Sequence, residues 1–182
     1  MTRSVQRLLL FVIAALVVAA DQYTKTLIRA RLAPFEMWSP IPALGDYFTV
    51  INTTNTGAAF GMFKNGGGIF TVVAVVVVAL IIFYYRRIPD GEIAIRVALG
   101  LQLGGAIGNL IDRLRFGTVT DFIYFHWKEI LHAPIFNLAD LSITCGVIVL
   151  AFLMWRENAN ERAASAASAD PLPAPPPTAS HE

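Results

Sequence analysis

The chain has 182 residues, of which 55% are hydrophobic and 15% are charged. Soluble domains carry charges at about a quarter of their positions, so this composition favours an integral membrane protein. The 14 lysines and arginines are balanced by 13 aspartates and glutamates, which leaves no basic field of the kind that gathers nucleic acid. We therefore expect membrane lipid, and no nucleic acid, among its partners.

The first apolar block runs from Leu8 to Ala20 and follows Arg3 and Arg7. A positively charged start before an apolar block is also typical of a cleavable secretory signal. Good helix formers continue from Asp21 to Leu32, however, and three further apolar blocks follow. This pattern favours a first membrane-spanning helix at about residues 5–29 over a cleaved signal.

Three more apolar blocks predict spanning helices at about residues 66–86, 93–111 and 135–155. Arg86-Arg87 and Pro89-Asp90-Gly91 stop the second block and form a tight turn. Each block is close to the roughly 20 residues that cross about 30 Å of hydrocarbon. The predicted fold class is an all-α membrane protein with four transmembrane helices and both termini on one side.

Two segments lie outside these blocks. Residues at about 35–64 include Tyr47-Phe48-Thr49-Val50-Ile51, a β-prone run with aromatic residues typical of a membrane interface. They predict a small extramembrane β element within a membrane domain of residues 1–162. Residues 163–182 are rich in Ala, Ser and Pro and are expected to form a disordered tail.

Polar side chains at the ends of the predicted helices are the candidate functional residues, because an Asp at a helix centre costs about 2.5–3.5 kcal/mol on insertion. Antiparallel helices bring all of these ends to the same membrane face, so the side chains are expected to form one cluster. A transporter would more naturally hold its carboxylates near the midplane. The candidates are Asp21, Asn55, Gly57, Asn109, Asp112, Arg113, Asp121, Asn137 and Asp140.

Helix three also carries Gly100, Gly104 and Gly108 at four-residue spacing, which favours close helix packing. Two interpretations of Asp112 stay open at this point. It can form a local ion pair with Arg113 that anchors the helix end, or it can belong to a functional site.

Asp121 and Asp140 lie in strongly apolar sequence, where an unpaired carboxylate is costly. Two carboxylates in a low-dielectric site share a proton and titrate as a pair, which is the arrangement of catalytic groups in an aspartyl peptidase. The alternatives are a proton-coupled transporter or channel that uses Asp112, Asp121 and Asp140 as a relay, and a scaffold protein whose glycine face only packs helices.

No metal site or cofactor is expected, because His126 and His132 lack the spacing of metal ligands. The orientation in the membrane is undecided by charge, since the two sides of the predicted topology carry equal numbers of Lys and Arg.

Five segments in order resemble the lipoprotein signal peptidases, the type II signal peptidases of bacteria. The resemblance covers nearly the whole chain apart from the C-terminal tail. The segments are Asp21-Gln22-Tyr23-Thr24-Lys25, Asn55-Thr56-Gly57-Ala58-Ala59-Phe60-Gly61, Gly104-Gly105-Ala106-Ile107-Gly108-Asn109-Leu110-Ile111-Asp112-Arg113, Val119-Thr120-Asp121-Phe122 and Phe136-Asn137-Leu138-Ala139-Asp140.

The resemblance implies an aspartic endopeptidase of the bacterial inner membrane that removes the signal peptide from diacylglyceryl-modified prolipoproteins, just before the lipidated cysteine. It implies a catalytic dyad of Asp121 and Asp140 near the periplasmic face, with both termini cytoplasmic. A β-rich cradle and a short periplasmic helix would lie outside the membrane, and the chain is expected to be a monomer. The other candidates would support the site or bind substrate; these are Asp21, Asn55, Gly57, Asn109, Asp112, Arg113 and Asn137.

Overall fold

The protein is described by a computed structural model that covers residues 3–56, 67–127 and 130–168. In these ranges, four helices are long and apolar enough to cross a membrane, which confirms the predicted fold class. The helices are α1 (Arg3–Arg31), α2 (Gly67–Tyr84), α3 (Ile93–Phe116) and α4 (Leu138–Ser168), with short 3-10 turns at η1 (Pro42–Leu44) and η3 (Tyr85–Arg87). The strands are β1 (Met37–Trp38), β2 (Phe48–Asn55), β3 (Val119–Trp127) and β4 (Leu131–His132).

The ends of the helices differ from the predicted spans in three places. α3 continues to Phe116. α4 begins only at Leu138, because Phe136 forms an antiparallel bridge with Ile123 of β3. The predicted disordered tail is wrong for residues 163–168, since α4 continues through them to Ser168. Alanine, the best helix former, extends the helix into this segment. Residues 169–182 of that tail lie outside the described residues.

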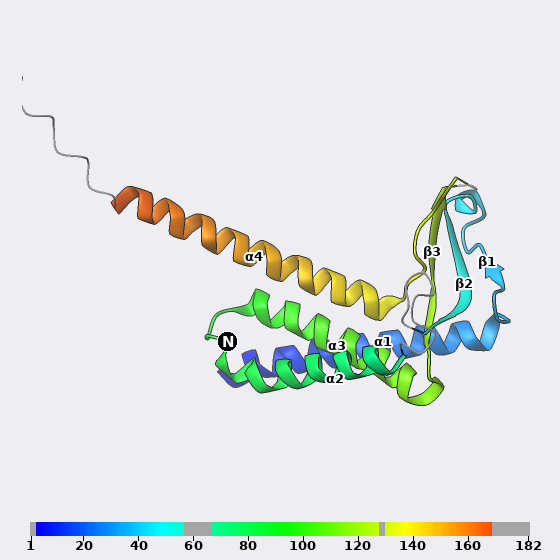
Figure 1. Ribbon diagram of the computed structural model, residues 1–182, viewed down its shortest axis with the longest axis horizontal. Helices are drawn as coiled ribbons and strands as arrows, with labels where there is room; N and C mark the ends of the chain where they lie inside the picture. The colour runs from blue at the N-terminus through cyan, green and yellow to red at the C-terminus, as the bar shows by residue number, and fades with distance from the viewer. Residues whose placement is uncertain (1–2, 57–66, 128–129, 169–182) are drawn as a thin grey trace, which may run out of the picture. The chain divides into compact units, whose positions relative to one another are not determined.

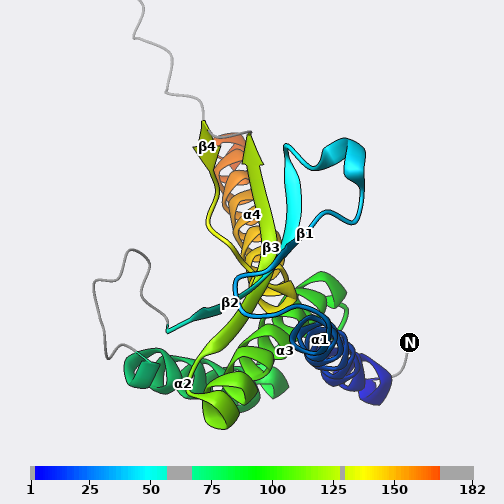
Figure 2. The same cartoon turned by 90° about the vertical axis from the view of Figure 1, so that its right-hand side faces the viewer.

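The chain forms two compact units, Met1–Leu150 and Ala151–Glu182. All the described candidate site residues belong to the first unit. In that unit, α3 lies between α1 and α2 (Figure 2). The strands stand across the end of the helices at which α1 finishes and α4 begins (Figure 1).

Glycines allow α1 and α3 to approach closely, as the sequence predicts. A Cβ at Gly104 would lie 2.6 Å from Cβ of Val17, and a Cβ at Gly100 would lie 2.8 Å from the carbonyl oxygen of Leu10. Neither position has room for a side chain, so small residues set the distance between the two helices. This confirms the close packing predicted for the glycines of α3.

α2 has the surface of a helix that faces lipid. Val72, Val73, Val75 and Val76 are largely exposed, while Ala74 is buried. A valine-rich face without polar side chains cannot be hydrated, so it belongs in hydrocarbon.

The four strands form one antiparallel sheet in the order β1-β2-β3-β4. Thr53 pairs with Asp121, and the register shifts between Val50 and Thr53. This irregularity is a β-bulge, a feature that redirects side chains and is common next to active sites. The sheet therefore holds Asp121 at the point where β2 and β3 change register.

Candidate active site

Asp121 is placed by the turn between α3 and β3. Gly117 ends α3 with a φ of 73°, and its N–H donates to the carbonyl oxygen of Arg113. Glycine adopts this left-handed conformation without strain, so the chain turns sharply into β3. Asp121 follows four residues later and is 2% exposed.

Asp140 is placed by the cap of α4. Its backbone N–H donates to Oδ1 of Asn137 at 2.9 Å, and the backbone N–H of Asn137 donates to Oδ2 of Asp140 at 3.3 Å. These reciprocal bonds form a capping box with Asn137 at the N-cap. The carboxylate of Asp140 thus lies in the first turn of α4, where the helix dipole favours negative charge.

Two asparagines connect the carboxylates. Nδ2 of Asn137 donates to Oδ1 of Asp121 at 2.6 Å and to Oδ1 of Asn109 at 3.2 Å. Nδ2 of Asn109 donates to Oδ1 of Asp140 at 2.8 Å. The structure therefore brings together Asp121, Asn137, Asn109 and Asp140 from β3, α4 and α3.

Asn55 supplies a second donor to Asp121, from its Nδ2 to Oδ2 at 2.9 Å. Burial raises the pKa of Asp121 from 3.8 to about 6, against the lowering effect of the hydrogen bond from Asn55. The nearby charge of Asp140 raises the pKa further, and the hydrogen bond from Asn137 lowers it. A carboxyl with a pKa of about 6 exchanges a proton readily near neutral pH, as acid–base catalysis requires.

A second polar group lies beside these residues and contains Asp21, Lys25 and Asp112, all fully buried. Nζ of Lys25 lies 2.9 Å from Oδ2 of Asp21 and 3.4 Å from Oδ2 of Asp112. It also donates to Oδ1 of Asn109 at 3.0 Å. Lys25 therefore joins the ion-paired group to the asparagines around the candidate dyad.

Asp21 and Asp112 hold neighbouring elements in place. Oδ1 of Asp21 accepts the backbone N–H of Ala139 at 3.1 Å, which satisfies a free donor at the start of α4. Oδ2 of Asp112 accepts the backbone N–H of Thr120 at 3.0 Å. Each carboxylate thus fixes the element that carries one member of the candidate dyad.

Of the two interpretations of Asp112, the contacts in the described residues favour membership of the polar site over a local ion pair with Arg113. The ion pairs of Asp112 are with Lys25 and with Arg29, whose Nη1 lies 3.6 Å from Oδ1. Successive residues point in different directions on a helix, so Arg113 faces another side of α3.

Sequence reasoning missed Lys25, Gln22 and Arg29 as members of the polar network. Nε2 of Gln22 donates to the carbonyl oxygen of Gly108 at 3.0 Å and to Oδ1 of Asp112 at 3.2 Å. The signal was available for Lys25, since it lies four residues after Asp21, on the same helical face. Gly57, also predicted at the site, lies outside the described residues.

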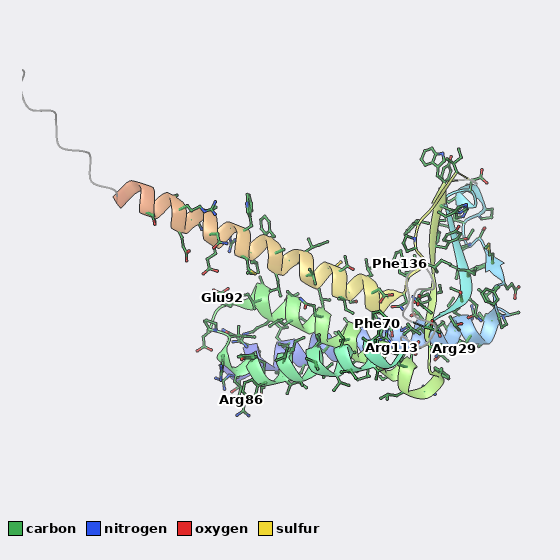
Figure 3. The ribbon with its side chains drawn as sticks, in the orientation of Figure 1. Arg29, Phe70, Arg86, Glu92, Arg113 and Phe136 are labelled. Carbon is green, nitrogen blue, oxygen red and sulfur yellow. The ribbon has the colours of Figure 1, made fainter. Side chains whose placement is uncertain are left out.

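A cavity of about 270 Å³ opens beside Asp140, between α2, α3 and the start of α4. Arg113 and Phe70 lie on its wall, with the guanidinium carbon 5.9 Å from the ring centroid (Figure 3). Nε of Arg113 is buried without a hydrogen-bond partner among the described residues. A larger cavity, about 520 Å³, lies at the end of α1 beside Arg29 and Arg31, and neither Asp121 nor Asp140 lines it.

Fold and site together define a multi-pass membrane enzyme with a buried carboxylate, Asp121, connected to a second, Asp140, on the wall of a cavity. Two solved structures of bacterial membrane enzymes, determined by the in meso method, are similar to the chain. One has a TM-score of 0.71 at 30% identity and covers 83% of this chain and 90% of the other. The second has a TM-score of 0.68 at 30% identity, covering 80% and 91%.

The family model of signal peptidase (SPase) II matches residues 13–156. Lipoprotein signal peptidases are similar to most of the chain. The protein of Symbiobacterium thermophilum is 43% identical over 79% of this chain and 91% of its own length. That of Syntrophotalea carbinolica is 40% identical over 85% and 96%, and that of Pseudomonas aeruginosa PAO1 is 39% identical over 84% and 90%. The chain belongs to the signal peptidase II family and is a membrane peptidase, as its resemblance predicts.

Proposed function

We propose that this protein is an aspartic endopeptidase that cuts diacylglyceryl-modified prolipoproteins just before the lipidated cysteine. Asp121 and Asp140 form the catalytic dyad, with the site at the outer face of the inner membrane, both termini in the cytoplasm and the protein acting as a monomer. The observation that carries the proposal is the pair of asparagine bridges, Asn137 and Asn109, that connect the buried carboxylate of Asp121 to the half-buried carboxylate of Asp140.

The dyad holds one proton between its two carboxyl groups. The ionised carboxylate takes a proton from water, and the water oxygen forms a bond to the scissile carbonyl carbon. The protonated partner donates to the carbonyl oxygen. When the C–N bond breaks, the leaving amine takes a proton from one carboxyl group, and a hydroxyl of the tetrahedral intermediate gives its proton to the other carboxylate. The dyad then again holds one proton.

The surroundings divide these roles between the two carboxyl groups. Burial raises the pKa of Asp121, which favours its protonated form. Asp140 lies in the first turn of α4 and lines the same cavity as Arg113. We therefore assign the proton donor to Asp121 and the general base to Asp140.

Arg113, Asn55 and Asn137 support the site. The unpartnered Nε of Arg113 offers a charged donor to a substrate carbonyl in the cavity. Asn55 and Asn137 hold both oxygens of Asp121 in fixed positions. Asp21 and Asp112 act on the fold through α4 and β3.

The test is processing of a diacylglyceryl-modified prolipoprotein by purified protein in detergent. Asp121→Asn and Asp140→Asn are each expected to insert normally and to lose cleavage. Asp46→Asn, an exposed carboxylate outside the spanning helices, is the matched control and is expected to remain active. Mass spectrometry identifies the new N-terminus as the lipidated cysteine.

Three further arms separate the alternatives. An unlipidated precursor is expected to remain uncut, and a chelator is expected to leave the rate unchanged. Full cleavage by Asp121→Asn would contradict the dyad. Proton flux that depends on Asp112, Asp121 and Asp140, without cleavage by the unaltered protein, would favour a transporter, and a loss of stability alone would favour a scaffold.

A further inference from the structure

Gln102 is a polar residue in the apolar part of α3 that the network around the dyad does not include. Its Nε2 is buried and has no hydrogen-bond partner among the described residues. A buried donor without an acceptor is unfavourable, and in hydrocarbon no water replaces the acceptor. Such a group needs an explanation, and a bound ligand that supplies the acceptor provides one.

The residue that carries this amide also borders a cavity between the helices. Gln102 lines the cavity of about 270 Å³ that also contains Asp140 and Arg113. On the facing side, a Cβ at Gly146 of α4 would lie 2.7 Å from Cγ of Gln102 and 3.3 Å from Nε2. Any larger residue at Gly146 would displace the glutamine, so two elements together place this side chain.

The lining residues of α3 show how deep the amide lies. Gln102, Ala106, Asn109 and Arg113 are separated by four, three and four residues, so they share one face of the helix. At about 1.5 Å per residue, Gln102 lies roughly 10 Å further along the helix than Asn109, away from the sheet. Apart from Asp140, the lining residues contributed by α2 and α4 are apolar, among them Val73, Val77 and Ile143.

The substrate of the proposed reaction has an acceptor that fits this position. A signal peptide in hydrocarbon satisfies its main-chain carbonyls by forming a helix. The segment next to the scissile bond must leave the helix to reach the dyad, which frees carbonyls in a place without water. At about 3.3 Å per extended residue, a depth of 10 Å corresponds to about three residues from the scissile bond.

We propose that the side-chain amide of Gln102 binds a main-chain carbonyl of the signal peptide, about three residues before the scissile bond. The inference rests on the proposed function, because it takes the cavity beside Asp140 as the path of the peptide. Gln102 is then a substrate-binding residue that stabilises the unwound segment. It binds the main chain and does not recognise any side chain of the signal sequence.

The first experiment compares Gln102→Met with the unaltered protein on a diacylglyceryl-modified prolipoprotein peptide in detergent. Methionine keeps the length of the side chain and removes the donor. The expected result is a rise in KM of about five- to fiftyfold, the scale of one buried hydrogen bond, with unchanged thermal stability. Thr144→Val, which removes an exposed hydroxyl of α4 away from the cavity, is the matched control and is expected to leave KM unchanged.

The second experiment locates the acceptor. Peptides with a single ester in place of an amide, at each of the second to fifth positions before the scissile bond, carry one weakened carbonyl acceptor each. If Gln102 binds one of these carbonyls, that ester raises KM for the unaltered protein but adds little for Gln102→Met. Such non-additivity at one position only is the signature of a direct interaction.

The outcomes separate this inference from the proposed function. Two results would overturn the inference while the unaltered protein still cuts the substrate and the proposed function stands. Gln102→Met could have the same KM as the unaltered protein, or Gln102→Met could lose activity equally with every ester peptide. A substrate with ether-linked chains in place of the ester-linked acyl chains tests the lipid as the acceptor. If this change, and no backbone ester, raises KM for the unaltered protein but adds little for Gln102→Met, the amide binds the lipid and the peptide carbonyl is overturned. No cleavage by the folded, unaltered protein would overturn both.

Discussion

The side-chain amide of Asn137 donates to Oδ1 of Asp121 at 2.6 Å, while its own carbonyl accepts the backbone N–H of Asp140. One residue therefore fixes the orientation of one carboxylate and caps the helix that carries the other. Asn137 therefore has a structural role in α4 and a role in the candidate active site.

Asn137→Ala is expected to reduce both stability and cleavage. Loss of the cap costs about 0.5–2 kcal/mol in the free energy of unfolding. Loss of an oriented donor from an active site lowers the rate by about 10²-fold. Thermal unfolding and a prolipoprotein cleavage assay measure the two effects, with Asn158→Ala, an exposed asparagine of α4, as the control. Cleavage at the unaltered rate would exclude the bridging role.

Asp121 is expected to make stability depend on pH. Its pKa rises from 3.8 to about 6 on folding because the carboxyl is buried, so between these values the folded protein holds a proton that the unfolded chain has released. The free energy of unfolding therefore falls as pH rises through this window, by up to about 3 kcal/mol. Asp121→Asn removes this pH-dependent contribution to the free energy of unfolding and flattens the curve of melting temperature against pH. An equally steep curve for the variant would contradict the raised pKa.

Lys25→Met is expected to destabilise the protein strongly, because it removes the cation beside the buried carboxylate of Asp21 and leaves Asp112 only the more distant Arg29. Removal of one partner from a buried ion pair costs about 3–5 kcal/mol. Addition of Asp112→Asn to the same chain should restore part of the loss, since one unpaired charge is then gone. Melting temperatures in detergent test this, with the exposed Arg31→Met at the end of α1 as the control. Similar melting temperatures for Lys25→Met and Arg31→Met would rule out the ion-paired core.

Gly104→Ala is expected to separate α1 from α3, since the added Cβ would lie 2.6 Å from Cβ of Val17. Overpacking of this kind costs about 1–3 kcal/mol. Gly68→Ala is the matched control, because a Cβ there meets nothing within 4 Å. Alanine should be neutral or stabilising at Gly68, by up to about 1 kcal/mol through helix propensity. Equal effects of the two substitutions on thermal unfolding would exclude close packing at Gly104.

The sequence by itself determined the membrane class, the four spanning helices and the family. These follow from apolar runs, glycine spacing and short motifs, which are local properties of the chain. The gathering of Asn55, Asn109, Asp121, Asn137 and Asp140 was also predictable, because antiparallel helices bring their ends to one face. Local reasoning was wrong at residues 163–168, where the Ala and Ser composition suggested disorder and the structure continues α4.

Only the tertiary structure decided which polar groups meet. The bond from the backbone N–H of Ala139 to Asp21 joins residues 118 positions apart, and no local pattern predicts such a partner. Lys25, which was not among the predicted site residues, is fully buried, because the ends of α1 and α3 close around it. The unpartnered amide of Gln102 likewise becomes visible only when Gly146 of α4 is packed against it. Such partners depend on packing between distant segments, which hydrophobic periodicity does not specify.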